Sequence, residues 1–300
     1  MPGAGRYAPS PTSQLHLGNL RTAVLCDLFA HATGRELRLR IEDLDTTRVR
    51  AAAGVEREQL ADLAALGLRF DGPVVRQSER LEAYAAAAAS LGEGVYECFC
   101  TRREIAEAAS APHCDGYRPY PGTCRDLSPA ERAARRRERP AALRIRGEGA
   151  RQTVHDELHG EVTGEVDDFV LRRGDGVWAY NFAVVVDDLA MGVDQVVRAD
   201  DLLSSAPRQA WLAERLGGQA PAYAHVPLVL NADGVRLAKR DGAVSLADLA
   251  AEGHTVDDVL GWIGRSLGLT GPDERTELGV LRERFDPART PRDPVVFTGL

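Results

Sequence analysis

The chain has 300 residues, and 44% of them are hydrophobic, which is enough to bury the core of one large or two smaller domains. A formal net charge of −8 excludes a globally basic nucleic-acid binder and leaves only a local basic surface for such a partner. Residues 1–10 lack the apolar segment of a secretory signal, and no apolar run approaches the ~18 residues that span a bilayer. We therefore expect a soluble, cytoplasmic protein with no membrane partner.

The start of the chain predicts a strand–loop–helix–strand unit. Residues 5–12 are typical of a short strand that runs into a proline-broken loop. Apolar residues then recur at helical spacing over residues 17–28, and Gly34 is placed to end that helix. Residues 36–41 alternate polar and apolar side chains, as a strand should. Such a unit opens a doubly wound α/β sheet that binds nucleotides.

The remaining elements are predicted from apolar periodicity and turn residues. The sequence predicts helices at 56–66, 78–91 and 204–216, an exposed charged helix at 128–139, a hairpin of 169–173 with 177–180, a buried strand at 226–230, and helices from 245 onward before a proline-rich tail. Residues 182–186 form a continuous apolar run that fits either a buried strand or a buried helical turn.

The late turn of residues 236–242 contains Lys239, the only lysine of the chain, since 37 − 1 = 36 of the basic residues are arginine. An ammonium is a compact charge on a flexible stem that can follow a moving phosphate, whereas a guanidinium is a planar fork. The lone lysine therefore indicates a place where a point charge is needed. The alternative is an accident of composition.

The segment His16-Leu17-Gly18-Asn19 stands where the first loop meets the first helix. A helix N-terminus offers free N–H groups and a partial positive charge, which suit an anion such as the phosphates of ATP. Gly18 would let a ligand approach the backbone, and His16 can donate to a phosphate oxygen. The alternative is that His16 only starts the helix.

Together, His16-x-Gly18-x and the Arg-Leu-Ala-Lys-Arg run around Lys239 resemble the two ATP motifs of class I aminoacyl-tRNA synthetases. Five flanking segments resemble the glutamyl subgroup of that family, namely residues 6–12, 40–45, 180–188, 197–203 and 206–209. The resemblance covers about residues 5–245 and implies a class I synthetase-type Rossmann nucleotide-binding fold. Two departures stand out: Asn19 replaces a second histidine of many class I enzymes, and Arg236 and Ala238 replace the usual lysine and serine.

This resemblance implies a site that joins L-glutamate and ATP, with Mg²⁺, into glutamyl-adenylate and pyrophosphate. His16 and Lys239 would be the catalytic residues. The implied ATP-binding residues are Pro9, His16, Gly18, Asn19, Lys239 and Arg240, and the implied glutamate-binding residues are Arg6, Ala8, Ser10, Glu42, Tyr180 and Arg198. Forked guanidinium groups suit carboxylates, and a carboxylate suits the substrate ammonium. The alternatives are that Glu42 only pairs with Arg40 or Arg48 and that Tyr180 is a core residue.

Four of the five cysteines lie between Cys98 and Cys124, which is more typical of a metal site than of a disulfide framework. Cys98, Cys100 and Cys124 fit a structural Zn²⁺ site, with a Cys-x-Cys knuckle and a second loop. Spacing leaves the fourth ligand open, with His113 and Cys114 as ordinary donors. The pattern of the glutamyl subgroup implies Tyr120. Unligated buried thiols are the alternative to any metal.

Only 300 − 242 = 58 residues follow Gly242, too few for the anticodon-reading domains of a full glutamyl-tRNA synthetase. The resemblance therefore narrows to the short paralogues, the glutamyl-queuosine tRNA(Asp) synthetases. It implies that glutamate is activated without tRNA and then esterified onto the queuosine base in the anticodon of tRNA(Asp), by an enzyme expected to be a monomer. The alternatives are a truncated conventional synthetase and a non-catalytic RNA-binding paralogue.

Four segments are expected on this basis. Residues 1–97 form the first half of a Rossmann catalytic domain and residues 98–175 a zinc-bearing insertion. Residues 176–244 form the second half with the Lys239 loop, and residues 245–300 a short helical C-terminal segment without an anticodon-binding domain.

Overall fold

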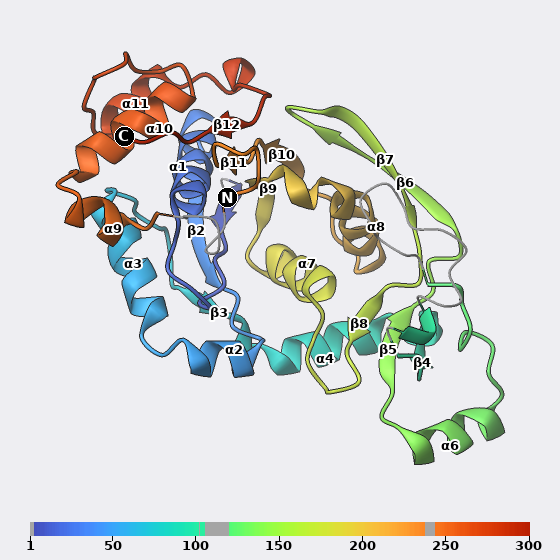
Figure 1. Cartoon of the computed structure of the whole chain (residues 1–300). Helices are drawn as coiled ribbons and strands as arrows, with labels where there is room; N and C mark the ends of the chain where they lie inside the picture. Colours follow the sequence, from blue (N-terminus) through green and yellow to red (C-terminus); the bar gives the residue numbers. More distant parts are fainter. Residues whose placement is uncertain (1–2, 102, 106–119, 238–243) are drawn as a thin grey trace.

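The computed structural model describes residues 3–101, 103–105, 120–237 and 244–300. Its centre is a seven-stranded sheet in the order β3-β2-β1-β9-β10-β6-β7 (Figure 1). Every neighbouring pair in this sheet is parallel except β6 with β7. The strands are β1 (Ala4–Tyr7), β2 (Glu36–Ile41), β3 (Val75–Arg76), β6 (Ala150–Asp156), β7 (Gly160–Val166), β9 (Val193–Ala199) and β10 (Ala222–Val226). The predicted doubly wound α/β sheet is confirmed.

Helices cover this sheet and extend beyond it. They are α1 (Leu17–Ala32), α2 (Thr46–Ala51), α3 (Val55–Ala65), α4 (Leu81–Ser90), α6 (Pro129–Glu138), α7 (Tyr180–Ala190), α8 (Ala206–Arg215), α9 (Leu246–Ala251), α10 (Val256–Ser266) and α11 (Leu278–Arg284). Short 3₁₀ turns occur at Gln77–Glu79, Gly92–Gly94, Asp200–Ser205 and Pro287–Arg289. Helix α6 carries no buried residue, so the predicted exposed charged helix is confirmed.

A second, antiparallel sheet joins β4 (Val95–Cys98), β5 (Ala142–Ile145) and β8 (Val170–Arg172), and it lies at the end of the molecule that carries α6 (Figure 1). The predicted division of the chain into four segments stays a prediction. Strands β6 and β7 fall within residues 98–175 by sequence, yet they continue the central sheet and pack beside α8.

Helix α1 forms the middle of the largest hydrophobic core. Its apolar residues from Leu17 to Ala30 are buried, and Gly34 follows the helix with φ of +65°, a conformation that glycine adopts without strain. Helices α10 and α11 lie beside α1 (Figure 1), where the Phe29 and Phe285 rings are 5.2 Å apart. Asp27 and Arg282 form an ion pair of 2.6 Å across the same contact. The C-terminal segment therefore shares one core with the central sheet.

One local prediction holds in shortened form, one was wrong, and one open alternative is decided. The predicted hairpin is present but short: β8 bridges Trp178 through Arg172, the Arg173 N–H donates to the Val177 carbonyl at 2.8 Å, and the Ala179 N–H donates to the Leu171 carbonyl at 2.9 Å. Tyr180 already begins α7. The strand predicted at 226–230 is interrupted: β10 ends at Val226, and the two-residue β11 (Val229–Leu230) pairs with β12 (Val295–Val296) in the C-terminal tail. The apolar run 182–186 is helical, because α7 is buried along most of its length.

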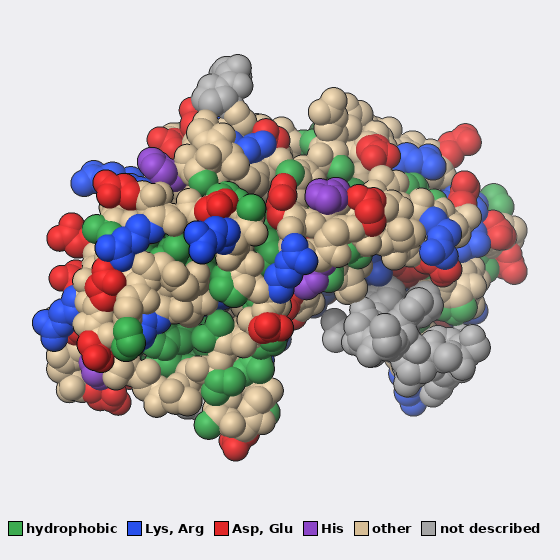
Figure 2. All heavy atoms as spheres, turned by 90° about the horizontal axis from the view of Figure 1, so that it is seen from above, with side chains coloured by type: hydrophobic (Ala, Val, Ile, Leu, Met, Phe, Trp, Pro, Cys, Tyr) green, Lys and Arg blue, Asp and Glu red, His purple; other side chains and the backbone are tan. Residues whose placement is uncertain are grey.

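Figure 2 shows acidic and basic side chains interspersed over one face of the molecule, so no single sign of charge dominates that face. Among the described residues, no helix is both long enough and apolar enough to cross a membrane.

Candidate active site

The order of the central strands places a cavity at the carboxyl ends of β1 and β9. The chain runs from β1 to β2 on one side and reaches β9 on the other, so the strand order reverses between β1 and β9. Ligands of open α/β sheets bind at such a switch point, outside the carboxyl ends of the strands. A cavity of about 510 Å³ lies there, walled by the loop after β1, by Glu42 after β2, and by Ala199, Asp201 and Leu202 at and after the end of β9.

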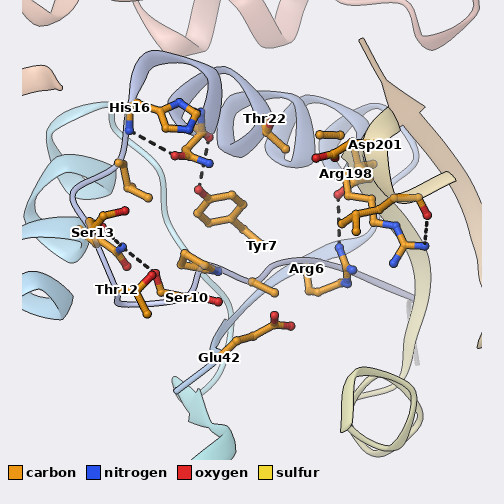
Figure 3. Close-up of a pocket in the computed structure, with 18 of the residues that line it drawn as sticks. Arg6, Tyr7, Ser10, Thr12, Ser13, His16, Thr22, Glu42, Arg198 and Asp201 are labelled. Carbon is orange, nitrogen blue, oxygen red and sulfur yellow. Dashed lines mark hydrogen bonds between the residues drawn. The ribbon is translucent and has the colours of Figure 1, made fainter. Parts of the chain in front are cut away.

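Most of the predicted site residues are brought together in this cavity. The residues on its wall are Arg6, Ala8, Pro9, Ser10, His16, Asn19, Glu42, Tyr180 and Arg198. Gly18 lines a small recess that shares His16 and Asn19 with the cavity. Figure 3 shows His16 at one end, beside the start of α1, and Arg6, Glu42 and Arg198 at the other. After the roles predicted for these residues, we name the end with His16 the phosphate end and the end with Arg6, Glu42 and Arg198 the amino-acid end.

His16 is the N-cap of α1 and makes a reciprocal pair with Asn19. The His16 Nδ1 atom accepts from the Asn19 backbone N–H at 3.3 Å, and the Asn19 side-chain oxygen accepts from the His16 backbone N–H at 3.2 Å. Burial, with the nearby Arg236 charge, lowers the pKa of His16 to about 4, so the ring is neutral. Because Nδ1 is the acceptor, the ring proton is on Nε2. His16 is therefore held as a neutral donor.

Gly18 leaves room for the ring of His16. A Cβ atom added at Gly18 would lie 3.2 Å from two ring atoms of His16 and 3.6 Å from Val229. The absence of a side chain thus allows the imidazole to lie against the first turn of α1.

Lys239, Arg240 and Ala238 lie outside the described residues, but the chain on both sides of them meets the start of α1. The Leu17 N–H donates to the Val244 carbonyl at 3.0 Å, and His16 forms a bridge with Ser245. On the other side, Leu237 and Arg236 line the recess beside His16, and Arg236 pairs with Asp201. Both ends of the Lys239 turn therefore lie next to His16.

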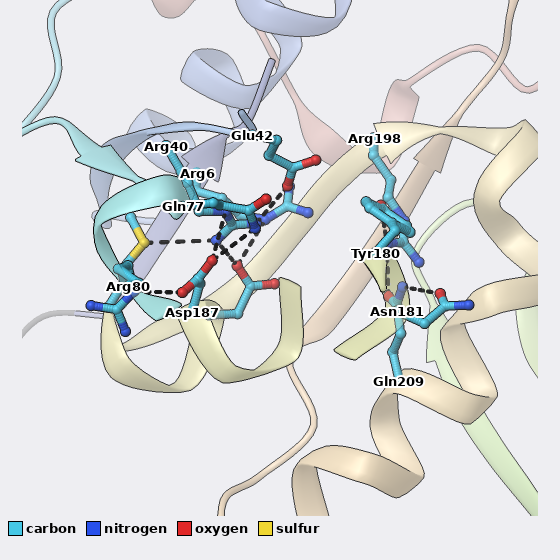
Figure 4. Close-up of polar contacts among 12 residues, drawn as sticks. Arg6, Arg40, Glu42, Gln77, Arg80, Tyr180, Asn181, Asp187, Arg198 and Gln209 are labelled. Carbon is cyan, nitrogen blue, oxygen red and sulfur yellow. Dashed lines mark hydrogen bonds and ion pairs between the residues drawn. The ribbon is translucent and has the colours of Figure 1, made fainter. Parts of the chain in front are cut away.

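At the amino-acid end, a buried charge network supports Arg6 and Glu42 (Figure 4). Arg40 is fully buried and donates to Glu42 at 3.1 Å and to Asp188 at 2.5 Å. The Arg6 Nε atom lies 3.4 Å from the same Asp188 carboxylate. The pairing of Glu42 with Arg40 is thus real, and the Glu42 carboxylate also lines the cavity. Burial raises the pKa of Glu42, while Arg40 and Arg6 oppose that rise.

Asp187 fixes the other side of this network. Its carboxylate accepts from Gln77 at 2.8 Å, from Tyr84 at 2.8 Å and from Arg80 at 2.6 Å. These donors come from the turn before α4 and from α4 itself, so that helix is tied to α7. Figure 4 shows Gln77 and Arg80 beside Asp187.

Arg198 and Tyr180 face the cavity from β9 and from the start of α7. The Arg198 Nη1 atom lies 3.4 Å from the Tyr180 hydroxyl and donates to Gln209 at 2.8 Å. Tyr180 is 39% exposed, so it is not a core residue. The sequence missed Gln59, whose side-chain amide donates to the Ser10 and Ser13 carbonyls at 3.1 and 2.7 Å and so holds the loop after β1. No local signal in helix α3 marks Gln59 for this role.

The three thiols predicted to hold a metal lie together at the end of β4. Their sulfur atoms are within 4.8 Å of one another, and Cys100 and Cys124 are 3.6 Å apart. The Tyr120 hydroxyl lies 3.4 Å from the Cys98 sulfur and 3.6 Å from that of Cys100. Zn–S bonds of ~2.3 Å and a Zn–O bond of ~2.0 Å at tetrahedral angles require S···S distances of about 3.8 Å and S···O distances of about 3.5 Å. The donor set therefore fits a tetrahedral metal ion.

His113 and Cys114, the other candidates for a fourth ligand, lie outside the described residues. Cys26 is buried in the core of α1, away from this cluster.

Comparisons with known proteins identify the family. The model of the family "tRNA synthetases class I (E and Q), catalytic domain" matches residues 4–275. A Nocardia farcinica protein named glutamyl-Q tRNA(Asp) synthetase is 60% identical over 299 residues, which cover 99% of this chain and 93% of that protein. A protein of the same name from Cutibacterium acnes is 56% identical over 266 residues, which cover 89% of this chain and 76% of that protein.

Among solved structures, a glutamate tRNA ligase from Elizabethkingia meningosepticum matches with a TM-score of 0.82 at 26% identity, covering 99% of this chain and 67% of that one. The fold predicted from the two ATP motifs is thereby confirmed. The chain belongs to the class I tRNA synthetases, a family of ligases, and within them to the glutamyl-Q tRNA(Asp) synthetases.

Proposed function

We propose that this chain, as a monomer in the cytoplasm, activates L-glutamate with ATP to glutamyl-adenylate without tRNA. It then esterifies the glutamate onto the queuosine base in the anticodon of tRNA(Asp), with AMP as the leaving group. The observation that carries this proposal is a single cavity with a neutral imidazole donor at one end and paired guanidinium and carboxylate groups at the other. Glutamate offers one ammonium and two carboxylates, which match such a set.

In the first step, an oxygen of the substrate α-carboxylate attacks the α-phosphorus of ATP, and the bond to the β-phosphate oxygen breaks to release pyrophosphate. Class I synthetases use ATP with Mg²⁺, which supplies positive charge to the phosphates. His16 donates its Nε2–H to a phosphate oxygen, and the Lys239 ammonium neutralises the charge that develops on the leaving group. Pro9, Gly18, Asn19 and Arg240 complete the ATP site.

At the amino-acid end, Arg6 and Arg198 bind the carboxylates and Glu42 accepts from the ammonium. Tyr180, Ala8 and Ser10 also line the cavity. Holding both reactants in one cavity converts a bimolecular reaction into an effectively unimolecular one. Asp188, Arg40 and Gln209 hold Arg6, Glu42 and Arg198, respectively, by ion pairs and hydrogen bonds. Little reorganisation of these side chains is therefore needed when the reactants bind.

The substrate is tested with labelled glutamate, ATP and three RNAs. We expect label on tRNA(Asp) that contains queuosine, and none on queuosine-free tRNA(Asp) or on the acceptor end of tRNA(Glu). Glutamate-dependent ATP–pyrophosphate exchange should proceed with no tRNA present. Label on tRNA(Glu) would instead favour a conventional synthetase, and the absence of exchange without tRNA would contradict the tRNA-independent activation proposed here.

The same proposal assigns a structural Zn²⁺ to Cys98, Cys100, Cys124 and Tyr120. We expect one zinc per chain by elemental analysis. Cys98→Ser and Tyr120→Phe should each weaken zinc binding at least about tenfold, since the loss of even an outer-shell partner has that effect. Because bound metal contributes folding free energy, both variants should also melt at lower temperature.

Cys26→Ala removes a thiol outside the cluster and should retain full zinc content. If Tyr120→Phe binds zinc as tightly as the wild type, while His113→Ala or Cys114→Ala loses it, the tyrosine is not the fourth ligand.

A further inference from the structure

Three neighbouring parallel strands carry a buried chain of polar side chains that ends in the cavity. Asp156 is on β6, His225 on β10 and Arg198 on β9. His225 is the direct register partner of Arg198, and Asp156 pairs with Tyr223, two residues before His225. Asp156 and His225 are 0% exposed and Arg198 is 5% exposed. The strand register therefore brings these three side chains into direct contact.

Among the residues that the structure describes, Asp156 accepts only from N–H groups. One carboxylate oxygen accepts from the Leu158 and His159 backbones at 3.0 and 3.1 Å. The other accepts from the His225 backbone at 3.1 Å and from the His225 Nδ1 atom at 2.6 Å. An ionised carboxylate is an acceptor only, so this arrangement places the proton of the His225 ring on Nδ1.

With Nδ1 protonated, the Nε2 atom of His225 is an acceptor, and Arg198 Nε donates to it at 2.9 Å. Burial lowers the pKa of His225, so the ring is neutral and does not repel the guanidinium. Gln209 accepts from Nη1 at 2.8 Å, and the Leu202 carbonyl lies 3.4 Å from Nη2. The guanidinium plane is thus held along its Nε side by His225 and along Nη1 by Gln209.

We infer that Asp156 and His225 are positioning residues for glutamate: Asp156 selects the His225 tautomer, and that tautomer orients the Arg198 fork toward the substrate carboxylate. This inference rests on the proposed function, in which Arg198 binds glutamate. Neither residue lines the cavity, so they act only through Arg198. A carboxylate is recognised through a planar fork, and a rotated guanidinium would lose part of that contact.

Three variants separate the two hydrogen bonds of His225. His225→Asn keeps a donor where Nδ1 lies and removes the acceptor for Arg198. His225→Gln places an oxygen near the position of Nε2 and restores that acceptor. Asp156→Asn replaces one carboxylate oxygen with an amide N–H₂ group, which donates instead of accepting. With this donor facing its Nδ1 atom, the His225 ring is favoured in the tautomer that carries the proton on Nε2. His155→Asn is the matched control, because His155 is an exposed histidine of β6 that pairs only with Glu161 among the described residues.

Exchange kinetics without tRNA give the first readout. In His225→Asn and Asp156→Asn, the KM for glutamate should rise about tenfold or more, as expected for the loss of a hydrogen bond to a charged group. The KM for ATP should stay within about twofold, because the phosphate end is untouched. His225→Gln should raise the KM for glutamate less than His225→Asn does, and His155→Asn should match the wild type.

Nitrogen-15 spectra of histidine-labelled protein give the second readout, which needs no activity. We expect the Nδ1–H tautomer for His225 in the wild type and the Nε2–H tautomer in Asp156→Asn. An Nε2–H tautomer in the wild type would overturn the inference. An unchanged KM for glutamate in folded His225→Asn and Asp156→Asn proteins would also overturn it, provided that the wild type catalyses exchange. A wild type without glutamate-dependent exchange would instead overturn the proposed function and, with it, the link to glutamate.

Discussion

Glu42→Gln is expected to lower glutamate-dependent exchange roughly 10²- to 10³-fold, because losing the charge that pairs with a buried substrate ammonium costs about 3–4 kcal/mol of binding free energy. The Glu42 carboxylate is both the acceptor proposed for the substrate ammonium and a partner of the fully buried Arg40. The amide keeps the shape of the side chain and loses its charge. The defect should appear mainly in kcat/KM for glutamate, measured by ATP–pyrophosphate exchange.

Glu56→Gln is the matched control for this prediction. Glu56 pairs with Arg76 at 2.6 Å, but both side chains are about one-third exposed, and this pair lies outside the cavity wall. Partly exposed ion pairs contribute at most about 1 kcal/mol, so exchange should be unchanged. If Glu42→Gln binds glutamate as tightly as the wild type, Glu42 serves only to neutralise Arg40.

His16→Ala is expected to lower kcat for exchange by about 10²- to 10³-fold, the effect of removing one preorganised donor to a transition-state oxyanion. The ring is neutral and carries its proton on Nε2, because Nδ1 accepts from the backbone of Asn19. The same substitution also removes the N-cap of α1, which should destabilise the protein by about 1 kcal/mol.

His16→Asn separates these two roles, because asparagine is a favourable N-cap that cannot reach as far as an imidazole. It should melt like the wild type and still lose exchange. Full activity in the His16→Asn variant would show that His16 is only a helix cap. If His16 and Lys239 contact the same triphosphate, the double variant His16→Ala with Lys239→Ala should lose less than the product of the two single losses.

Much of the fold can be predicted from the sequence, where the signal is local. The unit of β1, α1 and β2 agrees with its prediction within a few residues, because the spacing of apolar residues and the position of Gly34 indicate these elements locally. The two ATP motifs and the cysteine cluster are likewise short patterns that carry their own chemistry. Apolar runs at element junctions are harder to interpret: the run 182–186 fits a strand or a helix equally well until its packing is known.

The tertiary structure alone decided which charged groups meet. Nothing near Arg40 in the sequence indicates that it pairs with Asp188, and nothing near Arg198 indicates His225 or Asp156. The same holds for Gln59, which fixes the loop after β1 from a helix with no motif. These contacts depend on strand order and register between segments far apart in the chain. Local propensity and periodicity carry no information about that register, and it is set only when the core packs.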